Sequence, residues 1–160
     1  MKEKIILVLD VSSREEAMKL VRPLYEHVGM FKVGMQLFTA EGPSLVREIV
    51  DMGGKVFLDL KFHDIPNTVT HGVLEAARLG VSMMTIHAAG GRSMMKTVAQ
   101  KLSDNFGDRR PLVVAVTVLT SLNDAALKEI GVERTMEQQV VAMAKLAEES
   151  GIAGVVCSPH

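Results

Sequence analysis

Six short apolar runs recur along the chain and constrain its fold more than any other feature. Most are rich in β-branched residues and lack polar alternation, which is typical of parallel strands covered on both faces. They cover residues 5–9, 31–33, 55–60, 81–87, 112–119 and 153–157. The runs begin roughly every 25 to 40 residues, and this period indicates a repeated βα unit.

Helical patterns lie between these runs. Ser12 or Ser13 can cap a helix that begins at Arg14, and Pro23 is expected to end it. Thr135 and Gln138 have capping-box spacing for the last helix. The expected helices cover residues 14–23, 42–54, 66–80 and 93–106, a short segment after residue 123, and residues 135–151.

Two architectures accommodate such units, an open doubly wound sheet and an eight-stranded barrel. The first strand is followed by Asp10-Val11-Ser12-Ser13 and not by the glycine-rich turn of a dinucleotide-binding fold, which favours the barrel. We therefore predict an α/β fold, a (β/α)8 TIM-type barrel with about six βα units in this chain. Because no linker interrupts the pattern, residues 1–160 are predicted to form a single, partial barrel domain.

Composition excludes several function classes. A hydrophobic fraction of 48% and a formal net charge of −1 argue against disorder, nucleic-acid binding and membrane binding. The early run 5–9 is too short for a signal peptide or a membrane span. The chain has one cysteine, Cys157, which is typical of a reducing compartment, so a cytoplasmic location is predicted.

Polar side chains collect where the predicted strands end. The carboxyl ends of barrel strands meet at one rim, and barrel enzymes place their sites there. The candidates are Asp10, Lys32, Asp59, Lys61, His87, and Thr120 with Ser121. Thr120 and Ser121 could also cap the following helix, and the two roles are compatible.

The densest group of charges lies in residues 59–68, Asp-Leu-Lys-Phe-His-Asp-Ile-Pro-Asn-Thr. Residues two apart on a strand share a face, so Asp59 and Lys61 are expected to lie together. Asp64 follows where the chain must turn, since Pro66 suits the first turn of a helix. An isolated Asp-x-Lys pair is usually a surface ion pair. Two carboxylates beside an ammonium are costly to desolvate, which favours a chemical role.

His87, with His63 and Asp64, could suggest a metal site. The three residues do not form a spaced pair on one helix face, so a structural histidine is the better interpretation.

Five segments resemble the orotidine 5′-phosphate decarboxylase family in its bacterial form. They are residues 9–10, 31–34, 57–68, 86–91 and 115–121. Asp-x-Lys-x-x-Asp is shared with sugar-phosphate decarboxylases and hexulose-phosphate synthases of the same superfamily. The extension His-Asp-Ile-Pro-Asn-Thr is more specific to the orotidylate enzymes.

The resemblance implies a homodimer that converts orotidine 5′-monophosphate to UMP and CO2, the last step of de novo pyrimidine nucleotide synthesis, without metal or organic cofactor. It implies a catalytic network of Lys32, Asp59, Lys61 and Asp64, in which Lys61 protonates the carbanion at C6. Substrate-binding roles carry over to Asp10, Lys32, Asp59, Lys61, Asp64, Ile65, Thr68, Thr120 and Ser121.

Among these, Asp10 and Lys32 resemble ribose contacts, and either Thr120 or Ser121 resembles the pyrimidine contact. Asp64 and Thr68 resemble residues that reach into the site of the partner subunit.

No pattern for a seventh or eighth strand follows residue 157, where the family carries its phosphate-binding residues. We therefore expect a partial version of a protein of about 230 residues. We also expect a polypeptide that ends at His160 to have little or no decarboxylase activity. Two alternatives are a metal-dependent sugar-phosphate decarboxylase or aldolase of the same superfamily, and an inactive barrel fragment that acts only in assembly.

Overall fold

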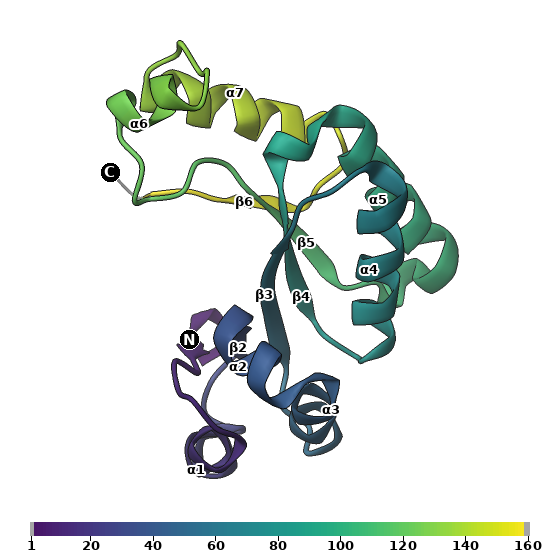
Figure 1. The fold of residues 1–160 in the computed structure, drawn as a ribbon. Coiled ribbons are helices and arrows are strands. Elements are labelled where there is room, and N and C mark those ends of the chain that lie inside the picture. The colour runs from purple at the N-terminus through teal and green to yellow at the C-terminus, as the bar shows by residue number, and fades with distance from the viewer. Residues whose placement is uncertain (1, 159–160) are drawn as a thin grey trace.

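Six parallel strands form one sheet in a computed structural model that describes residues 2–158. The strands are β1 (Ile6–Val8), β2 (Met30–Gly34), β3 (Val56–Phe62), β4 (Met83–His87), β5 (Leu112–Val116) and β6 (Gly154–Val156). Their spatial order follows the chain, and each strand pairs with the next. The helices follow an arc along the outside of the strands (Figure 1). The arrangement is an α/β half-barrel, which confirms the predicted fold class.

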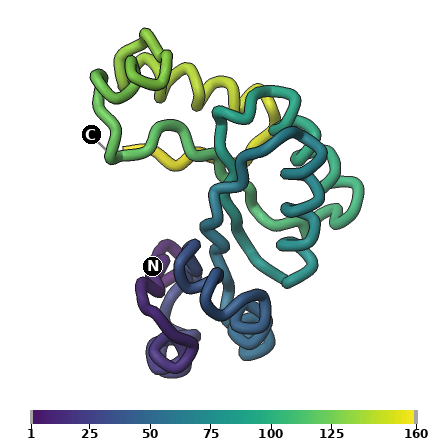
Figure 2. The backbone as a smooth tube through the Cα atoms, in the orientation of Figure 1, coloured from purple at the N-terminus to yellow at the C-terminus, as the bar shows by residue number. Residues whose placement is uncertain are grey.

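Seven α-helices and two short 3₁₀ turns connect the strands within residues 2–158, and a third 3₁₀ turn precedes β1. The helices are α1 (Arg14–Leu24), α2 (Met35–Glu41), α3 (Pro43–Asp51), α4 (Pro66–Arg78), α5 (Gly91–Phe106), α6 (Asp124–Glu129) and α7 (Met136–Glu148). The 3₁₀ turns are η1 (Lys2–Lys4), η2 (Ala88–Gly90) and η3 (Gly107–Arg109). The smooth trace in Figure 2 shows how the helical segment after each strand returns the chain to the start of the next strand. None of the helices among these residues is long and apolar enough to cross a membrane.

Side-chain caps confirm the predicted starts of two helices. The Ser13 hydroxyl accepts a hydrogen bond from the backbone N–H of Glu16 at the start of α1. Thr135 and Gln138 form the expected capping box at the start of α7. Each cap satisfies a backbone N–H that has no partner inside the helix.

Two local predictions were wrong. Pro23 does not end α1, because the helix continues to Leu24 and the N–H of Tyr25 still bonds to the Val21 carbonyl. Helix α2 was not predicted. It follows Gly34, which has no side chain to cap it, so the usual sequence signal for a helix start is missing.

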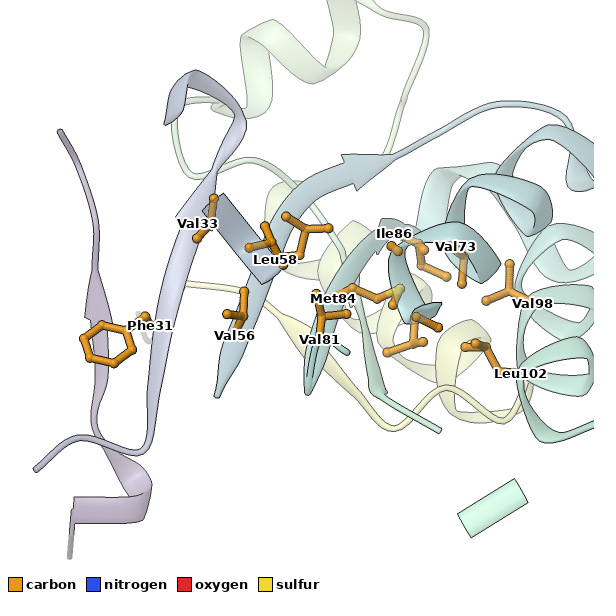
Figure 3. Close-up of a cluster of buried hydrophobic side chains, with 14 of the residues drawn as sticks. Phe31, Val33, Val56, Leu58, Val73, Val81, Met84, Ile86, Val98 and Leu102 are labelled. Carbon is orange, nitrogen blue, oxygen red and sulfur yellow. The ribbon is translucent and has the colours of Figure 1, made fainter. Parts of the chain in front are cut away.

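The main core lies between the sheet and the helices. Figure 3 shows Ile86 of β4 near the helical side chain of Val73, while Leu58 of β3 and Val98 of α5 lie farther apart in the same cluster. All four side chains are completely buried. This packing ties the carboxyl ends of β3 and β4 to a rigid support, so side chains that project from those ends are held in place.

The core predicts a clear contrast between two isoleucines. Ile49 in α3 is completely buried, whereas Ile130 is 66% exposed. Ile49→Ala should lower the free energy of unfolding by about 2 to 5 kcal/mol, because it removes buried surface and leaves a cavity. Ile130→Ala should change it by less than about 0.5 kcal/mol. Urea unfolding of both variants measures the difference, and equal effects would contradict this account of the core.

Candidate active site

Three charged side chains meet at the carboxyl ends of β2 and β3. Lys61 Nζ lies 2.8 Å from Asp59 Oδ1, and Lys32 Nζ lies 3.2 Å from Asp59 Oδ2. Each ammonium therefore binds a different oxygen of the same carboxylate. Asp59 is only 7% exposed, while both lysine side chains are partly accessible. We call Lys32, Asp59 and Lys61 the charged trio.

The charged trio carries a formal charge of +1, from two ammoniums and one carboxylate. Burial raises the pKa of the Asp59 carboxyl by disfavouring its charged form. Hydrogen bonds from Lys61, Lys32 and Thr85 favour that form more strongly and hold the pKa below its ordinary value of 3.8. Asp59 is thus ionised at neutral pH, and the excess positive charge faces the accessible side, where an anion can approach.

The backbone beneath the charged trio is irregular. Lys61 has a φ of 54°, the one positive φ of a non-glycine residue within residues 2–158. The register between β3 and β4 shifts between Leu58 and Phe62, which brackets Lys61. Such a conformation costs of the order of 1–3 kcal/mol and persists only where the surroundings hold it. Regular strand alternation therefore does not by itself explain how Lys61 reaches Asp59.

Thr85, on the neighbouring strand β4, connects this backbone to the carboxylate. Its Oγ1 accepts the Lys61 backbone N–H at 2.8 Å and donates to Asp59 Oδ1 at 3.0 Å. The sequence pattern did not distinguish Thr85 as a site residue. The available signal was a polar residue inside the apolar run 81–87, because a buried hydroxyl requires a partner.

Asp64 lies outside the charged trio. It is exposed beyond β3, and its Oδ1 accepts the backbone N–H of Ile65 at 2.6 Å. Among residues 2–158 it forms no ion pair with Lys61 or Lys32. Ile65 is 65% exposed, and Thr68 is exposed in the first turn of α4. These three predicted site residues project from the chain at the same rim.

The remaining predicted residues lie at other strand ends. Asp10 is exposed just after β1, next to Leu9, whose N–H bonds to the Lys32 carbonyl. Thr120 and Ser121 are exposed in the turn after β5. In the part of the chain that the structure describes, no hydrogen bond joins these side chains to the charged trio.

The two histidines near the site contact one another. The ring centroids of His63 and His87 are 5.1 Å apart, with planes inclined by 30°. Burial lowers the pKa of His87, and electrostatic interactions with His63 and Lys61 lower that pKa further against the opposing effect of Asp59. No group of three or more His, Cys, Asp or Glu side chains within residues 2–158 is arranged to hold a metal ion.

Six parallel strands, the first five followed by helices, with charged side chains at the carboxyl rim place the chain in the (β/α) barrel class of proteins. A family model described as "Orotidine 5'-phosphate decarboxylase / HUMPS family" matches residues 3–160. The chain belongs to this family.

Curated relatives and solved structures agree with this assignment. The chain is 49% identical over 156 residues to "Orotidine 5'-phosphate decarboxylase" of Pseudoalteromonas translucida, covering 98% of the chain and 66% of the relative. It is 51% identical over 162 residues to the protein of that name from Syntrophotalea carbinolica, covering 99% of the chain and 66% of the relative. The crystal structure of orotidine 5'-phosphate decarboxylase from Lactobacillus acidophilus superposes with a TM-score of 0.89 at 39% identity, covering 97% of this chain and 71% of that one. The chain thus spans about two thirds of the length of the curated relatives it matches.

The lowered pKa of Asp59 predicts how stability depends on pH. A group whose pKa is lower in the folded state stabilises that state above its unfolded pKa, and this contribution is lost as the pH falls through the folded value. The free energy of unfolding of the wild type should therefore be higher than that of Asp59→Asn, and this difference should be largest near neutral pH. The difference should become smaller below about pH 4.

Urea unfolding between about pH 3 and pH 7 measures this gap. Asp51→Asn is the matched control, because Asp51 is exposed at the end of α3 and its replacement should change little. A gap between wild type and Asp59→Asn that widens as the pH falls would contradict the assignment.

Proposed function

We propose that the protein decarboxylates orotidine 5′-monophosphate to UMP and CO2. One observation carries the proposal, namely that a buried carboxylate is shared by two ammoniums at the carboxyl rim of a barrel of this family. The names of the curated relatives support the same reaction. We further propose that residues 1–160 belong to one partial barrel domain, and that the reaction takes place in the cytoplasm.

The chemistry requires a positive charge beside one carbon atom. Loss of CO2 from C6 of the pyrimidine leaves its electron pair in an sp² orbital, which the ring cannot delocalise. The most direct stabilisation is a cation fixed where that charge develops. We assign this role to the Lys61 ammonium, which then donates a proton to C6 and so completes the product.

Asp59 has two effects in this scheme. It holds Lys61 by a 2.8 Å ion pair, so the ammonium is positioned before the substrate arrives. Its charge also lies near the substrate carboxylate and repels it. That repulsion falls as CO2 leaves, so it opposes the ground state more than the transition state. Lys32 keeps Asp59 ionised from the other side.

The remaining site residues fit a dimer. We propose that Asp64 and Thr68 of one subunit complete the site of the other, since both are exposed and project from the rim. A partner Asp64 would bring the charge of the network to zero.

Asp10 is proposed to contact the ribose, Thr120 or Ser121 to contact the pyrimidine, and Ile65 to line the substrate site.

Lys61→Ala should lower kcat by about 100-fold or more, because it removes both the carbanion-stabilising charge and the proton donor. The measurement is the absorbance decrease of orotidine 5′-monophosphate, followed with the product of the complete reading frame. Lys55→Ala is the control, since Lys55 is exposed just before β3 begins, at the end of the strand opposite to Lys61.

A rate for Lys61→Ala within about tenfold of wild type, or roughly 1.4 kcal/mol, would remove Lys61 from the proposed role. Activity that a chelator abolishes would point instead to metal-dependent sugar-phosphate chemistry.

Sharing of residues between subunits predicts complementation. Lys61→Ala and Asp64→Ala homodimers should each be nearly inactive. Their heterodimer has one site with both substitutions and one site with neither. Co-expression of the two variants should therefore restore up to about a quarter of wild-type activity, given random pairing. Mixtures no more active than the separate variants would indicate that Asp64 acts within its own subunit.

A further inference from the structure

The hydroxyl of Thr85 lies between the irregular backbone at Lys61 and the carboxylate of Asp59. It is 2.8 Å from the Lys61 backbone nitrogen and 3.0 Å from Asp59 Oδ1. The Thr85 side chain belongs to a residue that is completely buried, so water cannot take its place. This one side chain therefore contacts both residues that the proposed reaction needs beside the substrate.

The direction of both hydrogen bonds follows from the chemistry of the groups. A backbone N–H can only donate, so the Thr85 oxygen accepts from Lys61. A hydroxyl has one proton, and here that proton points to Asp59 Oδ1. An ionised carboxylate only accepts, so this arrangement favours the charged form of Asp59. The two hydrogen bonds therefore run from the Lys61 N–H to the Thr85 hydroxyl, and from that hydroxyl to the Asp59 carboxylate.

The carboxylate of Asp59 is consequently held from three sides. Oδ1 accepts from Thr85 and Lys61, and Oδ2 accepts from Lys32. Without the hydroxyl, the carboxylate would be held only by the two flexible lysine side chains. The rigid strand β4 therefore fixes the plane of Asp59 through Thr85.

The same hydroxyl compensates for the irregular strand. Where the register between β3 and β4 shifts, the Lys61 N–H bonds to a side chain of β4. Loss of this partner would leave a partly buried N–H unsatisfied and a left-handed residue unsupported. The position of the Lys61 Cα, and hence the place its ammonium can reach, depends on this bond.

We propose that Thr85 is a positioning residue of the charged trio. It holds the Lys61 backbone in its left-handed conformation and turns the Asp59 carboxylate toward the Lys61 ammonium. The expected effect on turnover rests on the proposed function, whereas the expected effects on the Lys61 backbone and the Asp59 carboxylate do not.

The test compares Thr85→Val, which removes the hydroxyl, with Thr85→Ser, which retains it. Thr117→Val is the matched control, because Thr117 is buried in the adjoining segment after β5 and its hydroxyl donates to the Val156 carbonyl. The readouts are the hydrogen exchange of the Lys61 amide, the titration of the Asp59 carboxyl by NMR, and kcat with KM. All of these quantities are measured on the full-length protein.

Thr85→Val should speed exchange of the Lys61 amide by about tenfold or more. It should raise the pKa of Asp59, because a hydrogen bond to the charged form is lost. It should also lower kcat by about tenfold or more with little change in KM. Thr85→Ser should restore all three quantities toward wild type, and Thr117→Val should leave the Lys61 amide and the Asp59 titration unchanged.

An unchanged Lys61 amide and Asp59 titration in folded Thr85→Val would overturn the proposal, as would equal effects of Thr117→Val. If Thr85→Val does not fold, hydrogen exchange of the wild-type protein still tests the proposal. Fast exchange of the wild-type Lys61 amide would contradict its hydrogen bond to Thr85 and overturn the proposal. If the wild-type protein shows no orotidylate turnover, the proposed function is wrong. Exchange of the Lys61 amide and titration of the Asp59 carboxyl would still test the role of Thr85.

Discussion

The site depends on a single carboxylate that two ammoniums share. Asp59 is almost fully buried, and an isolated charge there would be strongly destabilising. Lys61 and Lys32 on its two oxygens, with the Thr85 hydroxyl, make the ionised form the favourable one. The result is a fixed arrangement of charges that need not reorganise when a substrate binds, which is the condition under which electrostatic stabilisation of a transition state is most effective.

The parallel half-barrel makes this arrangement possible. All strands point in the same direction, so their carboxyl ends, where the chain leaves the sheet, lie at one rim. Neighbouring strands bring Lys32 and Asp59 together although they are 27 residues apart in the chain. The packed helices hold the strand ends rigidly, while the rim itself is free to carry polar side chains. Stability and chemistry are thus divided between different parts of each βα unit.

Much of the fold and of the candidate site could be predicted from the sequence. The apolar runs and their period predict parallel strands, and their polar ends predict that Lys32, Asp59 and Lys61 gather at one rim. Helix α2 escaped prediction because Gly34 offers no capping side chain. The left-handed backbone of Lys61 could not be predicted, because a register shift between two strands leaves no signature in the local sequence. Thr85 was overlooked because apolar periodicity does not show which buried polar residue has a charged partner. The role of Asp64 depends on a second subunit, so one chain could suggest it only through family resemblance.

The strand order has a consequence for how such a chain acquires its structure. Each strand from β2 onward pairs with the strand that precedes it in sequence. During synthesis, every new strand therefore finds its partner already made, and no segment must wait for a distant one. Folding can therefore advance one βα unit at a time. Lys32 and Asp59 could then pair once β3 has docked on β2, well before the later helices have been translated.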